Sequence, residues 1–172
     1  VIQCLRDGGC AVRSAGRTIT LLAPQRLGSM PTVRTMPYPG FPTDSQAPLM
    51  AAACTAQGSA LFIETIFENR FRHAAELQRM GADIRISGRT ALVTGRALHG
   101  ASVRSTDLRG GAALVVAALA AQGESRVEDL THIDRGYEHF AEKLTAANCC
   151  KIKSFVERNR SSTFINKPVI QL

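Results

Sequence analysis

Residues 77–93 read Leu77-Gln-Arg-Met-Gly-Ala-Asp-Ile-Arg-Ile-Ser-Gly-Arg-Thr-Ala-Leu-Val93 and repeat an earlier stretch of the chain. The earlier copy, 72 residues upstream, is Leu5-Arg-Asp-Gly-Gly-Cys-Ala-Val-Arg-Ser-Ala-Gly-Arg-Thr-Ile-Thr-Leu21. In both copies the pattern predicts the end of a helix at a glycine, then an alternating strand, a tight glycine-containing turn and a second strand. A weaker third copy spans 143–153. An internal repeat of this kind indicates a domain built from similar units.

The segments that precede the second and third copies also correspond to each other. Each begins with a predicted helix that starts at a Thr-Asp pair and stops at a glycine: Thr43 to Gln57, with Thr43 or Asp44 as N-cap, and Thr106 to Gln122, with Thr106 or Asp107 as N-cap. Each continues with a predicted strand (Ser59 to Ile66, Glu124 to Leu130) and a second helix (about Arg72 to Met80, Tyr137 to Ala147). The unit is therefore strand, helix, strand, helix, strand, strand.

This repeat predicts an α/β (α+β) fold in which βαβαββ units form one pseudo-threefold domain with interior helices. We expect residues 1–36 to be the back half of a first unit, 37–100 a second unit and 101–153 a third. Residues 154–172 are polar and weakly periodic. We expect this tail to be frayed, to form an extra strand, or to be foreign to the domain.

Composition excludes several classes of protein. The 172 residues include 45% hydrophobic and 20% charged residues, which is a globular proportion and rules out an acidic disordered chain, a collagen and a coiled coil. Lys and Arg exceed Asp and Glu by seven, which favours anionic partners. Nine aromatic residues without a tryptophan give poor support to a nucleic-acid stacking surface. No apolar run is long enough to predict a membrane span.

The five cysteines, Cys4, Cys10, Cys54, Cys149 and Cys150, predict neither disulfides nor a metal site. Their number is odd, none forms a Cys-x-x-Cys pair, and no histidine stands at ligand spacing. A reducing, cytoplasmic compartment fits this usage best. Cys54 lies in an Ala-rich helical pattern and is expected to be a core residue.

A rigid carboxylate is predicted in the run Pro37-Tyr-Pro-Gly-Phe-Pro-Thr-Asp44. Its prolines restrict the backbone and place Asp44 at the start of a helix. Asp44 has two interpretations at this position: an ordinary helix cap, or a general base held in place for chemistry.

Three further runs place arginine beside acidic residues where strands and helices meet. They are Glu64-Thr-Ile-Phe-Glu-Asn-Arg-Phe-Arg-His73, Ser105-Thr-Asp-Leu-Arg-Gly-Gly111 and His132-Ile-Asp-Arg-Gly-Tyr-Glu138. Helix N-termini attract anions, and arginine adds bidentate phosphate or carboxylate geometry. Salt-bridged helix starts would have the same composition, so the pattern by itself leaves both interpretations open.

Together, the four runs resemble the UDP-N-acetylglucosamine 1-carboxyvinyltransferases of the enolpyruvyl transferase family, over about residues 5–147. The resemblance implies a two-domain enzyme with an inverse α/β barrel-like fold, of which this chain would be a C-terminal portion without its N-terminal partner domain. It implies transfer of enolpyruvyl from phosphoenolpyruvate to the sugar 3-hydroxyl, with release of phosphate. This is the first committed step of peptidoglycan synthesis in the bacterial cytoplasm.

By the same resemblance, Asp44 would be the base near the 3-hydroxyl and would contact the sugar nucleotide. Ile66 would lie against that nucleotide. The phosphate and carboxylate groups would be bound by Arg70, Arg109 and Arg135, with Asp107 in support. No metal and no cofactor are implied, and the partners are small molecules, not nucleic acid or membrane. The reactive cysteine and substrate-binding lysine of the family belong to the other domain, and Gly110-Gly111 replaces a pair that is often Ala-Ser.

Three alternatives stay open at this point. The chain could be a non-catalytic remnant that binds a phosphorylated metabolite, or part of a related shikimate-pathway enolpyruvyl transferase. It could also be a nucleic-acid binder that uses its positive charge. In the main interpretation, the chain alone is expected to be inactive.

Overall fold

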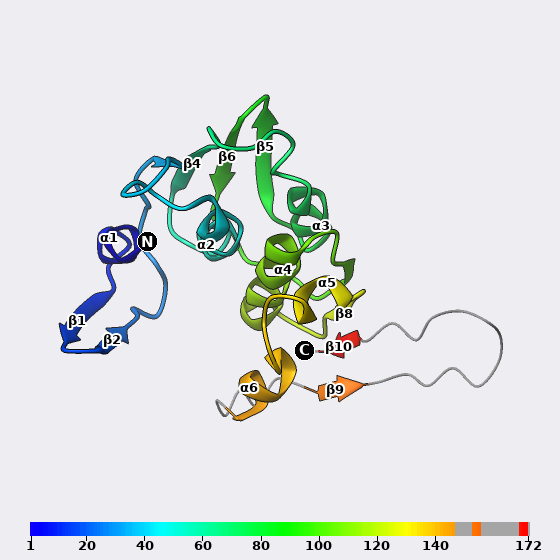
Figure 1. The fold of residues 1–172 in the computed structure, drawn as a ribbon. Coiled ribbons are helices and arrows are strands. Elements are labelled where there is room, and N and C mark those ends of the chain that lie inside the picture. The colour runs from blue at the N-terminus through cyan, green and yellow to red at the C-terminus, as the bar shows by residue number, and fades with distance from the viewer. Residues whose placement is uncertain (147–152, 156–168, 172) are drawn as a thin grey trace, which may run out of the picture.

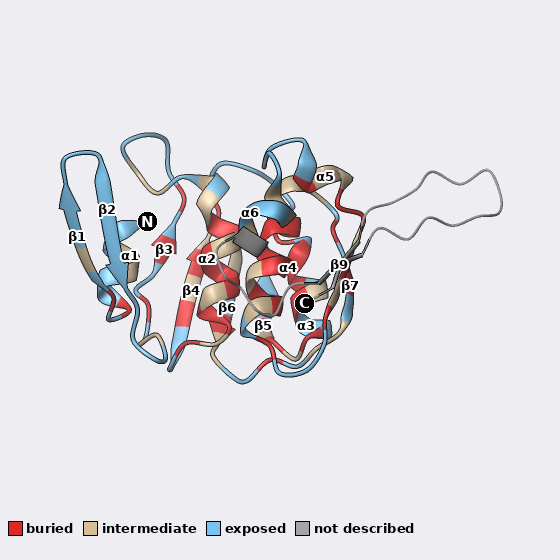
Figure 2. Cartoon of the chain, turned by 90° about the horizontal axis from the view of Figure 1, so that it is seen from below, coloured by how far each residue is buried: buried red, intermediate tan, exposed pale blue. Residues whose placement is uncertain are grey.

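Two apolar helices form the centre of the molecule. In the computed structural model, which describes residues 1–146, 153–155 and 169–171, α2 (Gln46–Ala53) packs along α4 (Leu108–Ala120) (Figure 1). Most residues of both helices are buried (Figure 2), as expected for helices that are apolar on all sides. The expected interior helices are therefore confirmed.

One four-stranded sheet covers α2. Its strands are β3 (Val33–Arg34), β4 (Ser59–Ile63), β6 (Thr90–Thr94) and β5 (Asp83–Ser87), in that order. The β3–β4 pair is parallel and the other two pairs are antiparallel. With α2 after β3 and α3 (His73–Arg79) after β4, the chain order is βαβαββ, as predicted.

A second four-stranded sheet lies beyond α4. Its order is β7 (Ser102–Arg104), β8 (Arg126–Glu128), β10 (Val169–Gln171) and β9 (Lys153–Phe155). Strands β7 and β8 are parallel, and the C-terminal strands β9 and β10 add to them antiparallel. Of the predicted tail, residues 154–155 and 169–171 lie in these two strands, and the other residues lie outside the described part of the chain. Cys149 and Cys150, like much of the third repeat copy, lie outside the described residues.

The first two copies of the repeat are confirmed element by element. Helix α1 (Ile2–Asp7) and strands β1 (Ala11–Ala15) and β2 (Thr18–Leu22) correspond to α3, β5 and β6 at the 72-residue spacing. The paired glycines share the left-handed conformation: φ is 93° at Gly9 and 90° at Gly81, and 55° at Gly16 and 56° at Gly88. Strands β1 and β2 form a separate two-stranded sheet that is largely exposed (Figure 2).

The predicted helix from Thr43 to Gln57 is wrong at both ends. A 3-10 turn, η1 (Thr43–Ser45), precedes α2, and α2 ends at Ala53. Neither Thr43 nor Asp44 caps the helix, because their side chains bond instead to Glu64 and to two arginines. By contrast, Asp107 caps α4 as predicted.

Two other predicted boundaries also change. The strand predicted to reach Ile66 stops at Ile63, since the Glu64 side chain accepts hydrogen bonds from the following backbone and turns the chain. The helix predicted from Tyr137 begins at Phe140 as α6 (Phe140–Ala146), because His139 has a positive φ of 50°. A short helix, α5 (Thr131–Asp134), precedes it.

Cys54 is fully buried in the core, as predicted, and burial raises the pKa of its thiol to about 12. Among the described residues, no helix has the length and apolar character that a membrane crossing requires.

Candidate active site

The N-terminal end of α4 presents Arg109 at a fixed position. Asp107 Oδ1 accepts hydrogen bonds from the backbone N–H groups of Arg109 (3.0 Å) and Gly110 (2.8 Å). This bond pattern satisfies two of the free donors at the helix start. A side chain at Gly110 would come within 2.9 Å of Asp107 Oδ2 and 3.0 Å of His73 Cβ, so glycine allows this close approach.

Asp44 lies between two arginines that come from different parts of the chain. Its Oδ1 is 3.1 Å from Arg70 Nη2, and its Oδ2 is 2.7 Å from Arg109 Nη2. The hydrogen bond from Arg109 lowers the pKa of Asp44 below its usual range; partial burial opposes this effect, and the charges of both arginines reinforce it. Asp44 is therefore a carboxylate near neutral pH, and with a side chain 56% exposed it is open to a ligand.

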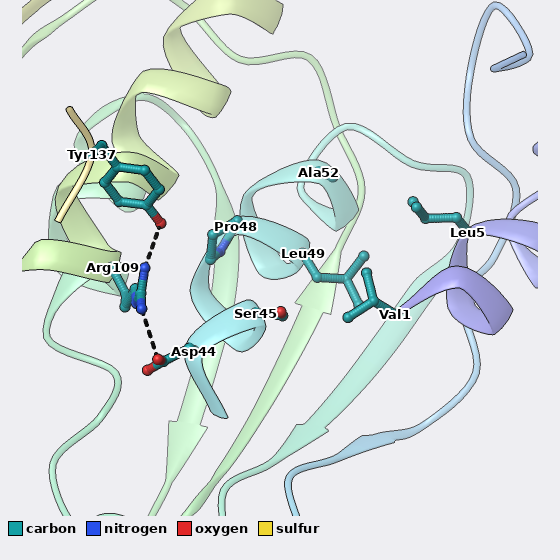
Figure 3. Close-up of a pocket in the computed structure, with 9 residues that line it drawn as sticks. All are labelled: Val1, Leu5, Asp44, Ser45, Pro48, Leu49, Ala52, Arg109 and Tyr137. Carbon is teal, nitrogen blue, oxygen red and sulfur yellow. Dashed lines mark hydrogen bonds and ion pairs between the residues drawn. The ribbon is translucent and has the colours of Figure 1, made fainter. Parts of the chain in front are cut away.

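Tyr137 holds the other side of the Arg109 guanidinium (Figure 3). Arg109 Nη1 donates to Tyr137 Oη at 3.0 Å, and the guanidinium carbon stands 5.4 Å from the centre of the tyrosine ring. The hydrogen bond to Asp44 raises the pKa of Arg109; partial burial opposes this, and the bond to Tyr137 adds to it. Because both ends of the guanidinium are bound, Arg109 loses little further freedom when it binds a ligand.

Arg70 comes from the segment that follows β4. Its guanidinium carbon lies 5.3 Å from the centre of the Phe67 ring, and its side chain is about as buried as that of Arg109. The segment is anchored by Glu64, a carboxylate only 1% exposed that accepts hydrogen bonds from the backbone N–H groups of Ile66 and Phe67.

Asp44, Arg70 and Arg109 form a charged cluster, and a pocket of about 440 Å³ opens beside it (Figure 3). Its polar end consists of Asp44, Arg109 and Tyr137, and the remaining wall comes from α2 and α1: Val1, Leu5, Ser45, Pro48, Leu49 and Ala52. Two guanidinium groups can bind an oxyanion with bidentate geometry, and a carboxylate beside them can accept a proton. Within the described residues, no three His, Cys, Asp or Glu side chains gather as they would around a metal ion.

The structure brings together four of the predicted site residues: Asp44, Arg70, Arg109 and Asp107. Ile66 lies on the same segment as Arg70 and is 37% exposed. Arg135 follows α5, is exposed, and among the described residues makes no hydrogen bond or ion pair with Asp44, Arg70 or Arg109. The roles implied for these residues remain predictions.

Sequence reasoning missed Glu64, His73 and Tyr137 as members of the site. Tyr137 stands two residues after Arg135 in the run His132 to Glu138, and this closeness in sequence to an arginine is the available signal. Glu64 and His73 are buried polar residues, and they are the first and last residues of the run Glu64 to His73. Burial of a polar side chain depends on tertiary packing, which no local pattern reports.

The comparisons with known proteins agree with this architecture. The family model of EPSP synthase (3-phosphoshikimate 1-carboxyvinyltransferase) matches residues 1–144. A UDP-N-acetylglucosamine 1-carboxyvinyltransferase 1 of Symbiobacterium thermophilum is 52% identical over 142 residues, which are 82% of this chain and 32% of that protein. A UDP-N-acetylglucosamine 1-carboxyvinyltransferase of a Synechococcus strain is 51% identical over 148 residues, 86% of this chain and 34% of the relative.

A solved structure shows the same fold. The enolpyruvyl transferase NikO of Streptomyces tendae superposes with a TM-score of 0.78 at 28% identity, over 86% of this chain and 34% of NikO. The chain thus spans about a third of the length of the relatives that it matches. On the family match, the shared repeat architecture and this likeness, the chain belongs to the EPSP synthase family of enolpyruvyl transferases.

Proposed function

We propose that this chain supplies the anion-binding and base residues of a UDP-N-acetylglucosamine 1-carboxyvinyltransferase. The observation that carries the proposal is the Asp44 carboxylate, bonded to Arg70 and Arg109 at the mouth of a pocket. Two relatives that are more than 50% identical bear the name of this enzyme, which favours it over a shikimate-pathway transferase.

The arginines match the charges of phosphoenolpyruvate, which carries a phosphate and a carboxylate. Arg70 and Arg109 bind these groups, and Arg135 joins them when the substrate is present. An incoming anion competes with Asp44 for the two guanidinium groups and so releases the carboxylate for reaction. Fixed positive charge at the phosphate also stabilises the charge that develops as phosphate leaves.

The reaction then takes place in two steps. Asp44 accepts the proton of the sugar 3-hydroxyl while that oxygen bonds to C2 of phosphoenolpyruvate. The electrons of the C2–C3 double bond take a proton from solvent at the methylene carbon, which gives a tetrahedral intermediate. The C2–O bond to phosphate then breaks and the new methyl group gives a proton to solvent, so that an enol ether remains on the sugar. Asp44 is ionised at neutral pH, and when the anion takes its arginine partners, the pKa of Asp44 rises and the carboxylate becomes a stronger base.

The proposal assigns the chain to the first committed step of peptidoglycan synthesis, in the cytoplasm, with small molecules as substrates. The resemblance implies that the reactive cysteine and the substrate-binding lysine of the family belong to the other domain. For this reason we expect the purified 172-residue chain to catalyse no transfer alone. Release of phosphate that depends on both substrates, with this chain as the sole protein, would contradict that expectation.

A graft tests the activity directly. Residues 1–144 replace the matching third of the Symbiobacterium enzyme, and phosphate release is measured with both substrates. We expect turnover, and Asp44→Asn should lower kcat by about tenfold or more, because an amide cannot accept the proton. Asp83→Asn, on β5, serves as the matched control and should leave kcat within about twofold of the parent graft.

Two results would overturn the proposal. A folded graft without turnover, beside an active Symbiobacterium parent, would show that these residues do not serve the reaction. Turnover of Asp44→Asn within tenfold of the parent graft would remove Asp44 as the base. Calorimetry on the 172-residue chain distinguishes a remnant that still binds: heat with UDP-N-acetylglucosamine but no turnover in the graft favours a non-catalytic binding protein.

A further inference from the structure

The Glu64 carboxylate connects the two segments that carry Asp44 and Arg70. Its Oε2 accepts a hydrogen bond from Thr43 Oγ1 at 2.9 Å, and Thr43 immediately precedes Asp44. Its Oε1 accepts from the backbone N–H groups of Ile66 at 2.8 Å and Phe67 at 3.1 Å, which begin the segment that ends at Arg70. A third partner of Oε1 is Thr35 Oγ1 at 2.8 Å, at the end of β3.

These bonds keep the group charged although it is buried. Burial by itself raises the pKa of Glu64, but hydrogen bonds from the Phe67 and Ile66 backbone and from the Thr35 and Thr43 hydroxyls outweigh it and lower the pKa. A carboxylate that accepts four bonds is a strong and directional anchor.

The contacts form a closed ring around the site. The ring runs from Glu64 through Thr43 to Asp44, crosses the 3.1 Å ion pair to Arg70, and returns along the chain through Phe67 to Glu64. In such a ring the length of the Asp44–Arg70 contact depends on where Glu64 holds the two flanking segments. Among the described residues, the Thr43 hydroxyl makes the side-chain hydrogen bond that joins Glu64 to the Asp44 segment, so its removal opens the ring at a defined point.

We propose that Glu64 is a positioning residue, which sets the separation of Asp44 and Arg70 through its hydrogen bond to Thr43. The inference rests on the proposed function for the statement that this separation matters for turnover; the geometric part stands without it. A purely structural role for Glu64 would stabilise the fold but would leave the environment of Asp44 unchanged when Thr43 loses its hydroxyl.

The first test measures the pKa of Asp44 in the 172-residue chain. The Asp44 carboxyl is followed by 13C NMR through a pH titration, with Asp44→Asn used to assign the signal. In Thr43→Val the loosened contact to Arg70 should raise the measured pKa of Asp44 toward its ordinary value, although the bond from Arg109 still keeps it below that value. Thr43→Ser, which restores a hydroxyl, should return the wild-type value.

A matched control comes from the other end of α2. Thr55 also uses its hydroxyl in a hydrogen bond, to the Ala52 carbonyl, and Thr55→Val should leave the pKa of Asp44 unchanged. If Thr43→Val does not fold, Thr43→Ala removes the same hydroxyl without filling its space, and the same rise is expected. An unchanged pKa of Asp44 in a folded Thr43→Val or Thr43→Ala chain would overturn the inference.

The second test uses the grafted enzyme of the proposed function. Thr43→Val should lower kcat by about tenfold, and Thr43→Ser should recover kcat to within about twofold of the parent. If the pKa shift is found but the graft has no turnover, the positioning inference holds and the proposed function fails. If the graft turns over normally in Thr43→Val and the pKa of Asp44 does not move, the inference fails and the proposed function stands.

Discussion

The segments α1–β1–β2 and α3–β5–β6 have the same local structure but very different surroundings. Their helices and strands correspond at the 72-residue spacing, and their paired glycines differ in φ by only a few degrees. Yet Ala91 and Val93 of β6 are fully buried, whereas the corresponding Ile19 and Leu21 of β2 are exposed. Local sequence therefore determines the shape of the hairpin, and its neighbours determine whether it contributes to the core.

The neighbours of the second hairpin are known in detail. Strand β6 pairs with β4 along its full length, and α2 packs against both strands. In the described part of the chain, β2 pairs with β1 and belongs to a sheet of two strands. An isolated pair of strands is marginally stable in water. The stability of the β1–β2 hairpin therefore depends on α1 and on the loop that follows β2.

The largest expected difference between the two segments concerns a leucine in each helix. Leu77 in α3 is fully buried, and its counterpart Leu5 in α1 is half-buried. Leu77→Ala should lower the free energy of unfolding by about 3 kcal/mol, and Leu5→Ala by about 1 kcal/mol. Urea denaturation of the 172-residue chain measures both. Equal losses would show that the first segment packs as tightly as the second.

The next largest expected difference between the two segments concerns how pH changes the free energy of unfolding. The first residue of α3 is His73, which is buried, and the corresponding position before α1 is Val1. Burial lowers the pKa of His73 to about 4; the charge of Asp107 opposes this, and that of Arg70 adds to it. The unfolded chain therefore binds the histidine proton first, and stability is lost as pH falls from about 6.5 to about 4.

Between neutral pH and pH 5 this loss should amount to about 2 kcal/mol. His73→Gln, which does not titrate, should flatten the dependence in that window while the drop below pH 4.5 remains. That lower drop belongs to Glu64 and Asp44, whose pKa values are lowered by folding and whose stabilisation is lost as they protonate. An unchanged slope between pH 7 and 5 in His73→Gln would remove His73 as the cause.

The smallest expected difference concerns the turn glycines Gly16 and Gly88. Both have φ near 55°, and a methyl group at either would meet no atom within 4 Å. Gly16→Ala and Gly88→Ala should each cost about 1 kcal/mol, with a difference below about half of that, since the backbone strain is the same. A much smaller cost for Gly16→Ala in urea denaturation would indicate that the first hairpin unfolds before the rest.

Features that depend on local sequence were predicted well. The glycine turns, the matched strand pairs and the Asp107 cap depend on residues close in the chain, and the structure shows them as expected. The start of α2 was predicted wrongly, because Thr43 and Asp44 bond to residues more than 20 positions away instead of to their own helix.

The same distinction applies to the site. Asp44, Arg70 and Arg109 of the motifs lie together in the structure, but the residues that hold them do not follow from the motifs. Tyr137 binds Arg109 from 28 positions away, and Glu64 is recognisable as an anchor once its burial is known. For Arg135, the described residues show no hydrogen bond or ion pair with the cluster, and its place beside a bound anion remains a prediction.

The hydrogen bond between Arg109 and Asp44 joins residues 65 positions apart, one at the start of α4 and the other just before α2. Such a contact closes a long loop and costs entropy until the two helices have docked. The Asp44–Arg109 pair thus requires the docked arrangement of the two helix starts, and a chain in which they lie apart lacks this part of the site. A small ligand that bound Asp44 and Arg109 together would act as a pharmacological chaperone, because it would bind only the docked form and draw the folding equilibrium toward it.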